Sequence, residues 1–185
     1  MRPLLLLALA AVLPLRAADA AFARAENKLD RIESGHARPG SVIVFTPAEM
    51  NAWARGRVPQ MYQGIRDPNI QLGAGTATGS AYVDLLKMRQ GEGLATNSLI
   101  AKLIEGERPL KVSIQLDSSH GHATARLTRL EISGIAVTGA PLDFLVNEFF
   151  LHLFPDAKVN RPFELHDNIE RIELRPDGVR VTIRK

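Results

Sequence analysis

Two histidines separated by one glycine, His120 and His122, are the pair of residues that comes closest to a metal site in this sequence. Imidazole nitrogen is a common metal ligand, but a stable site needs three or four ligands and further groups that orient them. Asp117 is the nearest additional ligand type along the chain, and no third histidine is close in sequence. The pair is more typical of a solvent-exposed turn, so we expect no metal site and no cofactor.

A second pattern, Gly73, Gly75 and Gly79, has some likeness to a nucleotide-binding loop. The dinucleotide fingerprint G-x-G-x-x-G follows a strand and opens a helix, because its glycines bring a helix N-terminus against the pyrophosphate. Here residue 78 is threonine, and a strand pattern follows instead of a helix. The spacing therefore favours a glycine-rich hairpin turn.

Nucleophilic chemistry has little support in this chain. There is no cysteine, which excludes a thiol nucleophile, thiol redox chemistry and cysteine-ligated zinc. A serine elbow of the form G-x-S-x-G is missing as well. The glutamates fall at unrelated positions and do not form paired carboxylates. We predict that the protein is not an enzyme, with a hydrolase that lacks a familiar motif as a minor alternative.

The charge distribution limits the possible partners. The formal net charge is +3, but lysines and arginines are scattered, with no run of four or more. Nucleic-acid binding favours a basic stripe with aromatic residues between the charges. We therefore expect no nucleic-acid partner, while weak or transient contact with a membrane surface stays open.

The first twenty residues have the pattern of a secretory signal. Arg2 supplies the positive charge, residues 4–15 are an unbroken apolar run, and Ala18-Asp19-Ala20 provides small residues for cleavage. The run is shorter than the roughly 20 residues that span a bilayer. We predict a signal peptide at 1–20, a single domain at 21–185, and export to the periplasm or the extracellular space. An uncleaved amphipathic anchor is the alternative.

The remaining sequence predicts short helices between antiparallel strand pairs. Apolar periodicity predicts helices over 22–32, 94–104 and 142–154, and a further helix from Pro47 to near Gly56 that begins with a Thr46–Glu49 capping box. A single strand is expected over 41–45. Alternation and turn residues predict hairpins over 65–88, 110–137 and 169–183, of which the second is the longest. Because the strands come in pairs without crossover helices, the pattern predicts an α+β fold.

The long hairpin contains two breaks in its alternation. Along the returning strand, 122–137, the apolar residues change parity twice, near Thr128 and near Gly134. One extra residue produces such a change, so we predict a β-bulge at each place and a strongly curved hairpin.

The helix at 142–154 is the most unusual element, since four of the seven phenylalanines lie in it. A helix that is apolar on nearly every side needs apolar surroundings on every side. We consider two interpretations, a buried central helix and a helix with one flank toward an apolar ligand, and either flank is a candidate. The predicted groove residues are Trp53, Leu142, Leu145, Val146, Phe149, Phe150 and Phe154.

Segments in both halves of the chain resemble the LmeA-like phospholipid-binding proteins. In the second half these are residues 137–142, the apolar helix, residues 162–172 and the closing hairpin at Asp177-Gly178; in the first half they are residues 46–51 and 79–84. The likeness covers about residues 40–184, and it differs at Asp143, where members of that family usually have a second proline. It implies a TULIP-like tubular lipid-binding fold, in which a long curved antiparallel sheet wraps around an apolar helix.

These observations lead to two expectations about function. The first is an exported lipid-binding or lipid-transfer protein that holds acyl chains in an apolar groove. The alternative is a non-catalytic structural or interaction module of the cell envelope, with the same fold and a filled core.

Overall fold

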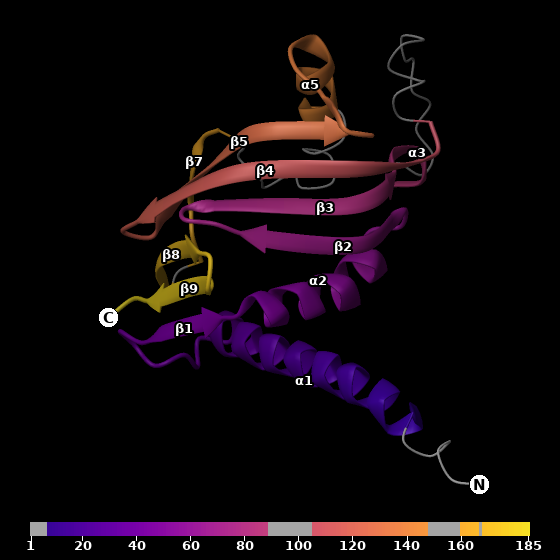
Figure 1. The fold of residues 1–185 in the computed structure, drawn as a ribbon. Helices are drawn as coiled ribbons and strands as arrows, with labels where there is room; N and C mark the ends of the chain where they lie inside the picture. Colours follow the sequence, from indigo (N-terminus) through magenta and orange to yellow (C-terminus); the bar gives the residue numbers. More distant parts are fainter. Residues whose placement is uncertain (1–6, 89–104, 148–159, 167) are drawn as a thin grey trace, which may run out of the picture.

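The computed structural model describes residues 7–88, 105–147, 160–166 and 168–185, and it has the predicted α+β fold (Figure 1). A large antiparallel sheet has the strand order β2-β3-β4-β5-β6, and β7 pairs with β5. Its strands are β2 (Ile65–Leu72), β3 (Thr76–Asp84), β4 (Glu107–Ser119), β5 (His122–Ile132), β6 (Ile135–Ala136) and β7 (Pro162–Glu164). The predicted helix at 94–104 lies outside the described residues.

A second, small antiparallel sheet has the order β1-β9-β8. It joins a segment from the first quarter of the chain to the last segment, because β1 (Val42–Phe45) pairs with β9 (Gly178–Ile183), which forms the predicted final hairpin with β8 (Ile169–Arg175). The described helices are α1 (Leu7–Glu33), α2 (Pro47–Met61), the one-turn α3 (Leu85–Met88) and α5 (Ala140–Leu145). This first strand was predicted, but its pairing with the last strand could not be predicted from local patterns.

Helix α1 runs without a break through the predicted cleavage site after Ala20. Residues 17–20 are exposed, and the side chain of Ala21 is buried. From Ala21 onward, the helix therefore packs on the domain. Among the described residues, no helix combines the length and the apolar character needed to cross a bilayer.

Helix α2 begins as predicted and ends later than predicted. The Thr46 hydroxyl accepts a hydrogen bond from the backbone N–H of Glu49, and the Glu49 carboxylate accepts one from the backbone N–H of Thr46, which is the predicted capping box. Gly56 does not end the helix, which continues to Met61. A Cβ atom at Gly56 would lie 2.5 Å from Cε2 of Phe22 in α1. The glycine therefore allows the two helices to approach each other closely.

We expect the substitution Gly56→Leu to destabilise the protein by about 2 kcal/mol, the usual cost of adding side-chain volume to a packed contact. Arg55→Leu is the matched control, because Arg55 is exposed one position earlier in the same helix. Urea denaturation of the two variants measures the difference. Equal stabilities would contradict the close contact between α1 and α2.

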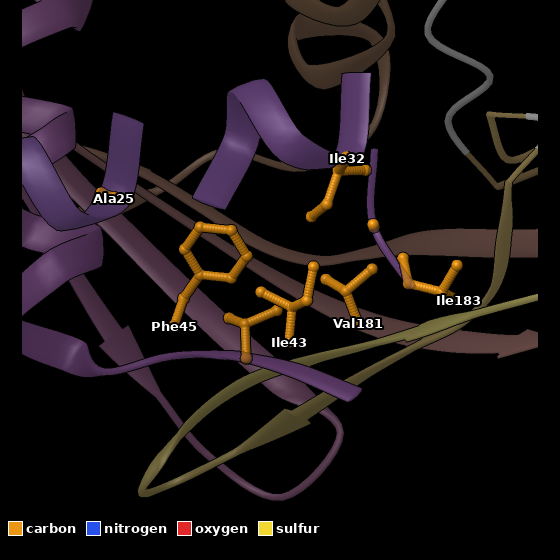
Figure 2. Close-up of a cluster of buried hydrophobic side chains, with 8 residues drawn as sticks. Ala25, Ile32, Ile43, Phe45, Val181 and Ile183 are labelled. Atoms are coloured by element: carbon orange, nitrogen blue, oxygen red, sulfur yellow. The ribbon is translucent and has the colours of Figure 1, made fainter. Parts of the chain in front are cut away.

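The first buried cluster holds α1 and α2 on the small sheet. Figure 2 shows Ile43, Phe45, Val181 and Ile183 of the small sheet pointing toward α1, from which Ala25 and Ile32 face them. Leu72 and Leu174 pack against the edge of this cluster. The chain ends and the large sheet are therefore joined through one apolar core.

The two irregularities predicted in the long hairpin have different outcomes. Ser113 pairs with Arg129 and Ile114 with Leu127, so Thr128 is an extra residue, and the first predicted bulge is confirmed. The second prediction is wrong, because β5 ends at Ile132 and a two-residue turn leads into β6. Ser133 and Gly134 have φ angles of 52° and 78°, as a type I′ hairpin turn requires. A tight turn changes the parity of the apolar pattern just as a bulge does.

The free edge of β8 is covered by the turns of the large sheet. The backbone N–H of Gly75 donates to the carbonyl of Leu174, and that of Gly121 donates to the carbonyl of Glu170, both at 2.9 Å. Between them the Ser118 hydroxyl donates to the carbonyl of Ile172 at 2.6 Å and accepts from its N–H at 2.7 Å. These bonds attach the small sheet to one end of the large sheet.

Two asparagines bind the outer strands of the large sheet at their edges. The Asn51 side chain donates to the carbonyl of Ile70 in β2 at 2.8 Å and accepts from its N–H at 2.7 Å. On the other side, the Asn160 side chain accepts from the N–H of Leu127 in β5, and its backbone N–H donates to the carbonyl of Ala125. Each asparagine occupies backbone groups that a further strand would otherwise use.

Candidate functional site

The large sheet has one polar and one apolar face, because its side chains alternate along every strand. On the polar face, Arg66 of β2 forms ion pairs with Asp67 and Glu107, and Arg126 of β5 forms one with Asp117 of β4. The hydroxyls of Thr78 and Ser113 are 2.9 Å apart across β3 and β4. Many polar side chains of this face therefore interact with one another.

On the apolar face, the register aligns apolar residues across neighbouring strands. Ile70 lies opposite Gly79, which lies opposite Val112; Leu72 lies opposite Ala77, then Ile114 and Leu127; and Leu116 lies opposite Ala125. With strands about 4.8 Å apart, four strands make an apolar surface about 14 Å wide.

The two ends of this face belong to the two buried clusters. At one end, Leu145 of α5 is buried in a second cluster with Leu130 and Ile132, and Leu142 and Phe144 pack against the same cluster. At the other end, Leu72 packs against the first cluster. The middle residues are half-buried and, in the described part of the chain, belong to neither cluster. We name them the apolar stripe: Ile70, Ala77, Gly79, Ile114, Leu116, Ala125 and Leu127.

Side-chain size is uneven across the apolar stripe. Strand β3 contributes only the small residues Ala77 and Gly79, which lie between large side chains of β2 and β4, such as Ile70 and Ile114. No described atom lies within 4 Å of a Cβ built at Gly79, and the φ of this glycine is not positive. Along β3 the apolar stripe therefore carries only small residues, and the described atoms leave room above them for additional atoms.

The structure separates the groove residues that the sequence predicted. Trp53 is half-buried against the first cluster, whereas Leu142 and Leu145 pack in the second. Val146 is half-buried just after α5. Phe149, Phe150 and Phe154 lie outside the described residues, so the greater part of the predicted apolar helix stays a prediction. Within the described residues, Trp53 and α5 do not share a cluster.

Sequence reasoning identified the alternation that produces the apolar stripe, but not the stripe itself. The apolar phases of β4 and of the first part of β5 were recognised from the sequence. Which residues of β2 and β3 lie beside them depends on the register, and no local pattern encodes it. The useful signal was the run of small residues in β3, Ala77, Gly79 and Ala81, in a strand otherwise suited to larger side chains.

Comparisons of the chain with protein-family models, with curated proteins and with solved structures return no match. The resemblance to LmeA-like proteins therefore stays a prediction.

A shallow depression of about 330 Å³ lies on the polar face, next to the β5–β6 turn. Its polar lining residues include Tyr82, Lys111 and Glu131. Lys111 is 3.9 Å from the Glu131 carboxylate, which also pairs with Arg129. The charged groups named here are therefore already engaged with one another, which makes the depression a weak candidate for a ligand site.

Charge pairing also governs the titration of Glu107 and Arg66 on this face. The hydrogen bond from Arg66 is the main cause that lowers the pKa of Glu107, and the same bond raises the pKa of Arg66. The guanidinium of Arg66 additionally lies over the Tyr82 ring, 4.9 Å from its centroid. Both groups are in their ordinary charged states at neutral pH, which favours a structural role.

The histidine pair lies at the turn between β4 and β5. His122 Nδ1 is 3.0 Å from the carbonyl oxygen of His120, and its Nε2 is 4.0 Å from the Glu164 carboxylate. Both histidines are exposed. Within the described ranges, no three residues of metal-binding type are grouped so that they could hold an ion.

Proposed function

We propose that this protein binds the apolar chain of a lipid along the apolar stripe and that it does so without catalysis. The observation that carries the proposal is the middle of the apolar face, which lies between two buried clusters and where no described atom is within 4 Å of a Cβ built at Gly79. A lipid chain needs a long apolar surface and few polar contacts, and this surface has both properties.

The energetics favour long chains. Each buried CH₂ group contributes about 0.8 kcal/mol, whereas association itself costs at least about 4 kcal/mol. Short chains therefore gain too little to bind. We expect affinity to rise by about fourfold for each added CH₂ until the stripe is filled.

The cellular context of this proposal comes from the sequence. The apolar run at residues 4–15 and the small residues at 18–20 support export to the periplasm or the extracellular space. The resemblance to LmeA-like proteins supports a phospholipid as the ligand and transient contact with a membrane as its source. The alternative, a structural module of the envelope, requires that the apolar stripe be filled by the protein itself.

Native mass spectrometry of the purified protein is the first experiment. We expect a population whose mass exceeds that of the polypeptide by the mass of a lipid, and which loses that mass on activation. A clean polypeptide mass, together with no uptake of added phospholipid, would support the structural module instead.

The substitution Gly79→Leu tests the location. A leucine at this position fills the space above the small residues of β3. We expect the affinity for a fluorescent long-chain lipid to fall by about tenfold or more, since several CH₂ groups of the lipid lose their contact with the stripe. Stability should stay the same or rise, because the new Cβ meets no atom of the described residues and glycine weakens a strand interior.

Gln71→Leu is the matched control, because it adds the same side chain on the polar face of the neighbouring strand. The control should bind lipid normally. If Gly79→Leu also keeps full affinity while remaining folded, the ligand does not lie on this face.

A further inference from the structure

The exposed large hydrophobic residues are concentrated at one end of the molecule. Among the described residues, four such side chains are exposed: Met61, Tyr82 and Ile135, and separately Val42. Met61 ends α2, just before β2 begins at Ile65, and Ile135 opens β6. Val42 lies in the small sheet. Met61, Tyr82 and Ile135 lie toward the same end of the large sheet.

Strand pairing places the start of β2, the end of β3, the start of β4 and the end of β5 at one end of the large sheet. Ile65 of β2 pairs with Val83 of β3, and Val83 pairs with Arg108 at the start of β4. Farther along the same end, Ile132 pairs with Ile135. Figure 1 shows the end of α2, the start of β2 and the end of β5 on one side of the molecule, opposite the small sheet.

Met61 and Ile135 are presented at projecting positions. Ile135 is 64% exposed and directly follows the tight turn at Ser133 and Gly134, and Met61 is 58% exposed in the last turn of α2. Tyr82 differs, because Arg66 lies over its ring. The apolar side chains at this end thus sit on two separate projections and do not form one flat patch.

The described cations beside these projections do not gather into a positive patch. Arg66 is paired with Asp67 and Glu107, Lys87 is 3.3 Å from Asp84, and Arg108 donates to the carbonyl of Glu105. Attraction to anionic head groups is therefore not the main force that this described surface offers toward a membrane. Burial of apolar side chains is the available driving force, and it acts equally on a zwitterionic bilayer.

The separation of Met61 and Ile135 determines which kind of partner fits this end. A stable protein interface buries more than about 1,000 Å² of surface, which two separated side chains do not supply. A lipid surface accepts separate apolar projections individually, so it fits this end better than a second protein does.

We propose that this end of the molecule docks on a lipid bilayer, with Met61 and Ile135 inserted among the lipids. The inference rests on exposure and topology and not on the apolar stripe, so it stands or falls separately from lipid binding inside the protein. A docked molecule has its second cluster and α5 near the membrane and its small sheet farthest from it.

The absence of cysteine allows a direct test with the full chain. Three single-cysteine variants, Met61→Cys, Ile135→Cys and the control Val42→Cys, are labelled with the environment-sensitive fluorophore NBD. On addition of phosphatidylcholine vesicles, the labels at 61 and 135 should emit more strongly and at shorter wavelength. The label at 42 should remain in water and show no change.

Three outcomes would overturn the proposal. One is that the labels at 61 and 135 stay in water although the protein floats with the vesicles, and another is that the protein does not associate with vesicles at all. The third is a shift at 61 or 135 that depends on protein concentration and not on vesicles, which would identify a second copy of the chain as the partner. Native mass spectrometry of bound lipid is unaffected by each of these results.

Discussion

Replacing Ile132 by alanine is expected to lower the free energy of unfolding by about 4 kcal/mol, near the upper end for removal of a buried aliphatic side chain. Ile132 is 1% exposed and is the largest fully buried side chain among the described residues. It lies in the second cluster with Leu130 and Leu145, where the large sheet meets α5. The substitution leaves a cavity among the other residues of the second cluster, and incomplete collapse of such a cavity adds to the loss. Urea denaturation measures the loss.

The matched control is Ile135→Ala, because Ile135 is the cross-strand partner of Ile132 in the same hairpin and is 64% exposed. We expect this change to alter stability by no more than about 0.5 kcal/mol. The same substitution is thus expected to have a large effect on stability before the turn and a small effect after it. Similar losses in the two variants would mean that the second cluster is not the core that the structure indicates.

Replacing Glu49 by alanine is expected to cost about 3 kcal/mol, since it removes the buried carboxylate of a partly exposed ion-pair network. Glu49 is 2% exposed. Its carboxylate accepts hydrogen bonds from Lys28 Nζ at 2.6 Å and Arg24 Nε at 3.1 Å, both on α1, and from the backbone N–H of Thr46 at 2.9 Å. The substitution therefore removes one of the two hydrogen bonds of the capping box and a polar link between α1 and α2 together.

The pH dependence of stability identifies this carboxylate. Burial alone would raise the pKa of Glu49, but hydrogen bonds from Lys28, Thr46 and Arg24, together with the charge of Lys28, outweigh it and lower the pKa. A lowered pKa means that the unfolded chain binds the proton first. The stabilisation is thus complete above about pH 4.3, the ordinary value for a glutamate, and is lost as the pH falls through the folded value. The difference in stability between wild type and Glu49→Ala should shrink over this range.

Arg24→Ala is the control for the ion pair. The Arg24 side chain is 57% exposed, so its loss should cost no more than about 1 kcal/mol. A stability difference between wild type and Glu49→Ala that stays constant down to pH 3 would argue against an ionised Glu49 in the folded protein.

The sequence predicted those parts of the fold that are encoded locally. The capping box at Thr46 and Glu49, the hairpin turns after β2 and β8, and the extra residue at Thr128 each depend on a few neighbouring residues. The paired strands then determined the α+β class. These features were predictable because a cap, a turn or a change of parity leaves a signature in a single short window.

The features that were missed depend on contacts between distant residues. Gly56 has the sequence signature of a helix end, but it is a contact point for Phe22. Gly134 has the signature of a bulge, but the strand reverses there. The apolar stripe exists only because β2, β3, β4 and β5 adopt one particular register. Local patterns show that each strand has an apolar side, and tertiary pairing determines which of these sides become one surface.

The asparagines at the edges of the large sheet limit what kind of molecule can be a ligand. A peptide that binds by extending a sheet needs a row of free backbone N–H and carbonyl groups, and it derives much of its affinity from them. Asn51 and Asn160 already engage such groups on β2 and β5, near the middle of each strand. Recognition of extended polypeptides by strand addition is therefore disfavoured at these positions, and the broad face of the sheet is left as the surface for molecules that offer no backbone at all.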